Sequence, residues 1–315
     1  MRFTGLKTTL LMLVGLLAGG PTLSATYYLP QNGPPLIGEI QFITALDGDK
    51  LSDISRRYGV GFQALLAANP KLDANSSLSG QTITIPSQHL LPDTPYQGLV
   101  VNLPEMRIYY YPTPLPGKPA VVSTYPIGIG KEGYKLPPLI SQITQKSVKP
   151  VWRVPKSIRA RQPYLPEVMA AGPDNPLGDY AMRLNTSSYL IHGTNNPHPI
   201  GQRISNGCIR MYPEDIALLF PMIPRGTPVR IINQAIKIAP MAHDVYVEAH
   251  APLSESTHDP WSIWEALDTT IDQAELDPGS LDRINRVVLS ASGLPVRIHT
   301  TDPALWTARK EDQQR

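Results

Sequence analysis

Three regions of the chain differ in the spacing of their hydrophobic residues. Residues 38–88 carry apolar positions at helical spacing between two extended runs, which predicts a small strand–helix–helix–strand unit. Residues 98–233 hold strand-length apolar and aromatic runs separated by Gly and Pro turns, which predicts a mainly β domain. Residues 234–305 end in a helical stripe and a strand, so we expect a small α+β addition, followed by a disordered tail at 306–315.

The β-rich region contains two stretches that do not follow a simple strand pattern. Residues 134–176 are Pro-rich and lack periodicity, which indicates a functional lid or binding loop. The run "YLIHG" predicts a strand that ends at His192, and a loop rich in Asn, Pro and Gly follows it. A helix is expected to begin at Pro213, with Ile216, Leu219 and Phe220 on one face.

The first 25 residues have the pattern of a secretory signal peptide. Arg2 and Lys7 precede a short apolar run, and small residues lie near a cleavage site after Ala25. An apolar run of this length is too short to cross a bilayer. We therefore expect a cleaved signal and a mature protein in the periplasm; the alternative is an uncleaved N-terminal anchor.

Composition narrows the possible partners. The chain has 28 basic and 26 acidic residues, and loss of Arg2 and Lys7 with the signal leaves 26 − 26 = 0. A neutral chain does not favour nucleic acid as a partner, because phosphate recognition requires a basic face. Cysteine occurs once, at Cys208, so the thiol is either free or an intermolecular link.

The residues around Cys208 predict a nucleophile. A cysteine thiol is only a few per cent ionised at neutral pH, and a neighbouring His192 would take its proton to give a thiolate–imidazolium pair. Gly193 permits a close backbone carbonyl, which would orient the imidazole through its other nitrogen. Backbone N–H groups from Asn206 to Cys208 would hold a developing oxyanion, and the Arg210 fork suits a substrate carboxylate.

Two other readings of Cys208 remain open on the residues alone. His192, His198 and Cys208 are types that ligate zinc, but they lack the paired spacing of strong zinc signals. Alternatively, Cys208 is a half-buried cysteine that behaves as a small hydrophobic residue. We expect no metal and no cofactor, and we expect His198 to be a surface histidine.

The motifs "HGTN" (192–195) and "SNGCIR" (205–210) resemble the signature of the L,D-transpeptidase family, the YkuD domain. The resemblance implies a YkuD-like β-sandwich over 98–233, with a nucleophile, a base and an orienting carbonyl, and with substrate-binding residues around the thiol. Many members have histidine where this chain has Asn206, and "KLPPLIS", with Leu136 to Leu139, replaces a T-P-x-G segment near the cleft. The implied catalytic residues are Cys208, His192 and Gly193, and the implied substrate-binding residues are Ser205, Asn206, Gly207 and Arg210.

Residues 38–88 resemble a LysM module, a family that binds N-acetylglucosamine-containing glycans such as peptidoglycan. The matching positions include Gly48-Asp49, Tyr58-Gly59-Val60, Asn69 and the run from Gly80 to Pro86. The start is less typical of the family. The alternative is a small α+β packing domain without a ligand.

The two resemblances together imply an enzyme that acts on peptidoglycan. A cysteine thioester would form on a tetrapeptide stem and pass to an amine, giving a 3→3 crosslink or anchoring an outer-membrane lipoprotein; carbapenems would acylate the same thiol. A hydrolase would pass the thioester to water. Further alternatives are a non-catalytic wall-binding protein and a metal-dependent amidase.

Overall fold

The computed structural model describes residues 26–74, 76–133, 136–185, 189–198, 200–205, 207–241, 244–254 and 278–299. The predicted signal peptide, Asn206, residues 255–277 and the predicted tail lie outside the described residues. Among the described residues, no helix is both long and apolar enough to cross a membrane.

The N-terminal unit has the predicted strand–helix–helix–strand order. Its outer strands pair antiparallel, and Leu51, Ile54 and Leu65 are buried between the helices and the strands. The Asn69 side chain fastens the second helix to the last strand, because its amide donates to Leu65 O and Thr84 O and accepts from the Thr84 N–H. The elements are β3 (Gln41–Thr44), α1 (Leu51–Arg57), α2 (Phe62–Ala68) and β4 (Thr82–Ile85), with β2 (Leu36–Gly38) paired to β5 (Gln88–Leu90) beside them.

The central domain is a ten-stranded sheet whose two layers share their longest strands. The strand order β8-β15-β13-β12-β9-β16-β6-β7 returns to β8, because β7 also pairs with β8. The predicted sandwich is therefore closed at both sides by β8 and β9. The strands are β1 (Thr26–Tyr28), β6 (Gly98–Asn102), β7 (Arg107–Tyr111), β8 (Val121–Gly130), β9 (Leu139–Val148), β12 (Tyr180–Leu184), β13 (Leu190–His192), β14 (Arg203–Ser205), β15 (Ile209–Met211) and β16 (Pro228–Ile232).

The long lid expected over 134–176 is wrong for its first part. Residues Leu139–Val148 form β9, which pairs with both β12 and β16. Most of its side chains are polar, and only Ile143 is buried, so the strand shows no apolar alternation. Backbone pairing on both sides holds β9 in place despite this.

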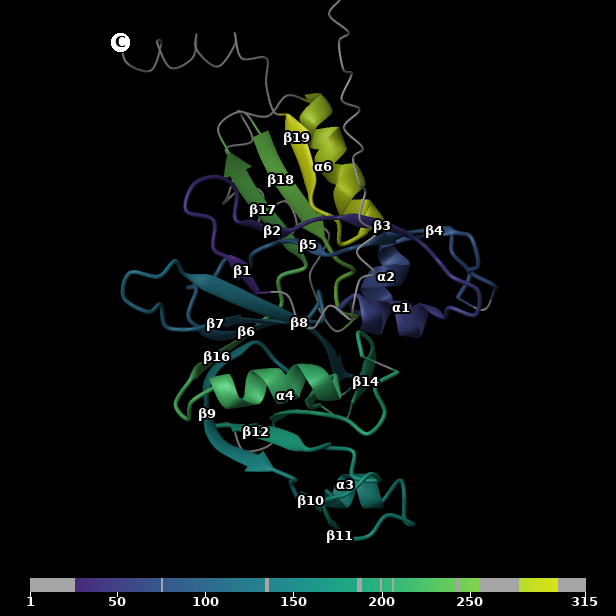
Figure 1. The fold of residues 1–315 in the computed structure, drawn as a ribbon, viewed down its shortest axis with the longest axis vertical. Coiled ribbons are helices and arrows are strands. Elements are labelled where there is room, and N and C mark those ends of the chain that lie inside the picture. The colour runs from purple at the N-terminus through teal and green to yellow at the C-terminus, as the bar shows by residue number, and fades with distance from the viewer. Residues whose placement is uncertain are drawn as a thin grey trace, which may run out of the picture.

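The remaining lid segment is a small unit at the end of the molecule opposite the C-terminal addition (Figure 1). It contains β10 (Trp152–Arg153), α3 (Lys156–Arg159) and β11 (Val168–Met169), with the two strands paired antiparallel. Asn175 is buried and closes the base of the unit, since its amide donates to Pro150 O and Ala170 O.

One helix packs on the central sheet, and a separate small sheet follows it. The helix α4 (Pro213–Met222) begins at Pro213 as predicted and buries Ile216 and Leu219 in the main core. The C-terminal addition has the expected α+β composition, with its helix packed on one side of its sheet (Figure 1). Its elements are β17 (Ile236–Met241), β18 (Asp244–Ala249), α6 (Pro278–Ser290) and β19 (Val296–His299).

Candidate active site

A parallel strand pair brings the two halves of the predicted site together. β13 pairs with β15, and the register sets His192 opposite Arg210. Cys208 immediately precedes β15, two positions before Arg210, so strand alternation directs both side chains to the face that His192 occupies. We expected Cys208 on a loop directly before a helix; the structure instead inserts β15, and this strand fixes the spacing between the two segments.

The imidazole of His192 is held in one orientation. Its Nδ1 lies 2.6 Å from the carbonyl oxygen of Gly193. A carbonyl can only accept a hydrogen bond, so Nδ1 carries the proton and Nε2 carries the lone pair. Burial, followed by the positive charge of Arg210, lowers the pKa of His192 to about 4. The side chain is therefore a neutral proton acceptor at neutral pH.

The Cys208 thiol is also neutral in this environment. Burial is the main effect and raises its pKa, while a backbone hydrogen bond to Leu190 and the charges of Arg210 and Arg183 act in the opposite direction. Both shifts disfavour the thiolate–imidazolium pair that the sequence predicted for the resting protein. The site favours transfer of the proton during attack, rather than before it.

The turn before Cys208 is organised by Ser205. This residue is buried, its hydroxyl donates to Cys208 O at 2.5 Å, and the Gly207 N–H donates to that hydroxyl at 3.2 Å. Gly207 has φ +102°, a conformation that side-chain-bearing residues rarely adopt. Asn206 lies outside the described residues. The Ser205 hydroxyl and the Gly207 N–H are thus engaged within the turn.

Arg210 has the properties of an anion-binding side chain. It is half-buried, and burial lowers its pKa. Its Nε atom is buried and has no hydrogen-bond partner among the described residues. A buried guanidinium donor without a partner is costly, so this position suits a carboxylate supplied by a ligand.

Several supporting residues were missed by the sequence reasoning. Gly178 has φ +65°, and a Cβ there would lie 2.7 Å from the backbone N of Thr194. The neighbouring Leu177 makes a backbone hydrogen bond with His192. The segment "AGPDNPLGDY" (171–180) contained the signal, because its Pro, Asn, Asp and Gly residues are typical of a tight turn.

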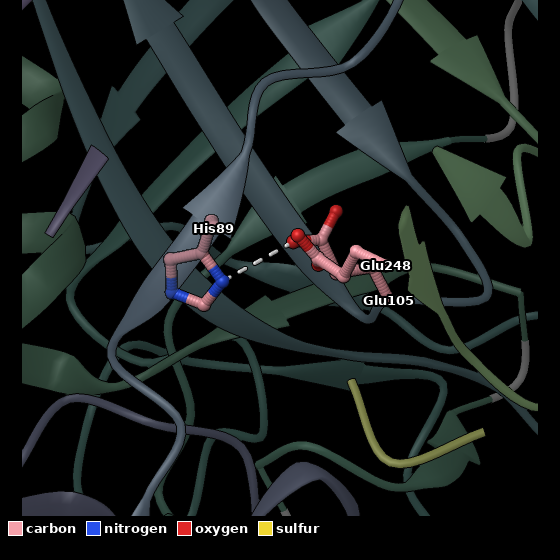
Figure 2. A group of neighbouring side chains, drawn as sticks. All are labelled: His89, Glu105 and Glu248. Atoms are coloured by element: carbon pink, nitrogen blue, oxygen red, sulfur yellow. Dashed lines mark ion pairs between the residues drawn. The ribbon is translucent and has the colours of Figure 1, made fainter. Parts of the chain in front are cut away.

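The residue types that bind metals gather elsewhere. Within the described ranges, a possible ligand group is formed by His89, Glu105 and Glu248 at the junction of the three units (Figure 2). Lys237 already supplies a cation there, because its Nζ lies 3.0 Å from Glu105 and 2.7 Å from Glu248. The zinc grouping of His192, His198 and Cys208 does not occur among those ranges, and His198 is exposed.

Comparison with known proteins agrees with both parts of this architecture. The YkuD L,D-transpeptidase catalytic domain matches residues 96–231, and the LysM domain matches residues 46–86. The pair defines a class: a catalytic domain built on a β-rich sheet and joined to a LysM domain.

Relatives extend the match to most of the chain. It is 40% identical over 300 residues to the probable L,D-transpeptidase YcfS of Escherichia coli K12, covering 90% of this chain and 92% of that protein. It is 37% identical to the probable L,D-transpeptidase ErfK/SrfK of the same organism, covering 90% and 94%. The NMR structure of the E. faecium L,D-transpeptidase catalytic domain covers 45% of this chain and all of that chain, with 23% identity and a TM-score of 0.34.

The chain belongs to the L,D-transpeptidase family. The family, the mainly β catalytic fold, the transpeptidase class of enzyme and the LysM domain expected from the motifs are thereby confirmed. The two domains make the protein a cell-wall enzyme with a peptidoglycan-binding part.

Proposed function

We propose that Cys208 is the nucleophile and His192 the base of an acyl transfer from peptidoglycan stems. The observation that carries the proposal is the His192–Gly193 contact of 2.6 Å, which leaves Nε2 as a proton acceptor on the strand beside the cysteine. Because both groups rest neutral, the thiol proton moves to Nε2 as sulfur attacks the carbonyl.

The reaction then proceeds in two balanced steps. Sulfur bonds to the carbonyl carbon of the third, diamino acid of a tetrapeptide stem, and the protonated His192 returns its proton to the leaving amine, releasing D-Ala. The product is a thioester on Cys208. An incoming amine gives a proton to His192 as its nitrogen bonds to the thioester carbon. The carbon–sulfur bond breaks, an amide forms, and His192 returns the proton to the sulfur of Cys208.

Substrate binding uses the residues around the turn. Arg210, with its unpaired Nε, binds a carboxylate of the stem, and Asn206 and Gly207 contribute to substrate binding beside the thiol. Ser205 supports this turn, because its hydroxyl is occupied by two contacts within it. The lid unit closes over the stem.

The location and partners follow from the same proposal. Residues 1–25 export the chain to the periplasm, the LysM domain holds the glycan, and carbapenems acylate Cys208 in place of the stem. The acyl acceptor is a second stem or the C-terminal lysine of an outer-membrane lipoprotein. No cofactor takes part.

Product analysis tests this function. Residues 26–315 are incubated with a disaccharide-tetrapeptide, alone or with a peptide ending in lysine, and the products are weighed by mass spectrometry. A dimer lacking one D-Ala indicates crosslinking, and a muropeptide–peptide conjugate indicates lipoprotein anchoring.

Two controls complete the test. Cys208→Ala is expected to abolish every product, and full product formation by this variant would contradict the proposal. A tripeptide in both arms would replace transfer with hydrolysis, the second candidate function, since both share the thioester. An intact tetrapeptide in both arms would favour a wall-binding protein.

A further inference from the structure

The LysM domain contacts the cysteine-bearing segment on its N-terminal side. The N–H groups of Phe62 and Gln63 donate to Ile200 O at 3.3 Å and Gly201 O at 3.1 Å. The backbones touch here: a Cβ on Gly61 would lie 3.1 Å from Gly201 Cα. Gly201 has φ +80°, and a Cβ there would lie 2.2 Å from Phe62 N. A side chain at position 201 is therefore excluded, and a Cβ at position 61 would be a tight fit.

The same domain also contacts the segment on its C-terminal side. Arg56 on α1 forms a two-pronged pair with Glu214 on α4, with Nε–Oε1 at 2.6 Å and Nη2–Oε2 at 2.9 Å. Its guanidinium lies 5.8 Å from the centre of the Tyr212 ring. The LysM domain therefore contacts the chain on both sides of Cys208. Arg56 contacts Glu214, six residues after the cysteine, and Gln63 contacts Gly201, seven residues before it.

Between these two points, the segment is also held by the central sheet: residues before Cys208 pair with β8, and β15, directly after Cys208, lies between β8 and β13. Ile129 N–H donates to Gln202 O, and Lys131 N–H donates to Ser205 O. Behind α2, a cavity of about 400 Å³ separates the LysM domain, the segment and the C-terminal addition. Gln202 and Arg203 line this cavity, so they are not packed against a core there. On the side of the LysM domain, the backbone contacts at Ile200 and Gly201 therefore hold the segment next to this cavity.

We propose that the LysM domain is a positioning element of the active site: its docking acts together with the pairing of β15 to hold Cys208 in place relative to His192. This inference rests on the function proposed above. An error of about 1 Å in the placement of a reacting group costs up to about a hundredfold in rate. Loss of docking should therefore slow acylation of Cys208 and leave the glycan-binding ability of the domain intact.

The first test wedges the interface at a residue outside the catalytic machinery. Gly61→Leu in residues 26–315 places a side chain against Gly201, whereas Gly61→Ala adds one methyl group. The measurement is the rate at which a carbapenem acylates the protein, followed by intact mass, with binding to purified sacculi measured in parallel. We expect acylation to slow by about tenfold to a hundredfold for leucine and less for alanine, with sacculus binding unchanged.

The second test uses the charge pair, and it decides the matter if Gly61→Leu does not fold. Arg56→Glu should slow acylation by about twofold to fivefold, the range of an exposed ion pair, and Arg56→Glu with Glu214→Arg should restore it. Arg57→Glu is the matched control, because the Asp49 partner of Arg57 lies within the LysM domain. Rescue by the swap would show that the Arg56–Glu214 contact, and not another contact of Arg56, sets the acylation rate.

The outcomes separate this inference from the proposed function. A wild-type protein that no carbapenem acylates, and that forms no product, would overturn the function itself. A wild-type protein that reacts at the same rate as Gly61→Leu and Arg56→Glu would overturn the positioning role alone.

Discussion

Asp215 provides a quantitative test of the electrostatics beside the site. It lies in the first turn of α4, and only 5% of its surface is exposed. Burial, with the negative charge of Glu214, raises the pKa of its carboxyl group to about 7. Its Oδ2 atom has no hydrogen-bond partner among the described residues. We predict that Asp215→Asn stabilises the protein above pH 7.

The size of the effect follows from the shift. The ordinary pKa of this carboxyl group is 3.8, so the rise to about 7 corresponds to about 4 kcal/mol. The folded state binds more protons than the unfolded state between these two values, so stability falls as pH rises through that window. Between about pH 5 and pH 8, the loss is about 3 kcal/mol. The asparagine variant does not titrate and escapes this loss.

The assay compares urea unfolding of wild type and Asp215→Asn by circular dichroism over this pH range. The difference in free energy of unfolding should grow by about 3 kcal/mol in favour of the variant as pH rises from about 5 to 8. Asp282→Asn is the control, because that carboxylate is exposed on α6. Parallel pH curves for wild type and Asp215→Asn would refute the reasoning.

Three further predictions concern the site and the core. The lowered pKa of His192 keeps it a base, so acylation of Cys208 should stay level between about pH 5.5 and 8 and fall with a midpoint near pH 4; a midpoint near 6.5 would contradict this. Lys237→Met leaves two buried glutamates without their cation and should cost about 3–5 kcal/mol in urea unfolding; an unchanged midpoint would show that the cluster contributes nothing. Gly178→Ala should slow acylation about tenfold, whereas Gly117→Ala, with a similar φ but open surroundings, should not; equal rates would contradict the packing argument.

The sequence predicted elements well where a local pattern decides them. Leu51, Ile54 and Ser55 are buried on one helix face, and Pro213 begins α4. Conversely, β9 shows no apolar alternation, since its place depends on pairing with two strands far away in the chain. No local sequence pattern encodes pairing with distant strands, so the sequence predicts a loop for this segment.

The site shows the same division. The β13–β15 pairing sets His192 opposite Arg210, but the protonation of His192 and Cys208 depends on burial, which spacing does not report. Likewise, Arg56 and Glu214 are 158 positions apart, and nothing in either local sequence links them. Docking of the LysM domain and the buried cluster around Lys237 are properties of the assembled chain.

The most direct test of the central claim is to locate the acyl group. Residues 26–315 are mixed with a tetrapeptide stem, quenched with acid, digested and analysed by tandem mass spectrometry. We predict a tripeptidyl thioester on the peptide that contains Cys208, and its absence in His192→Asn. An adduct on another residue would contradict this prediction. Turnover of the stem by Cys208→Ala, with no adduct formed, would also contradict it.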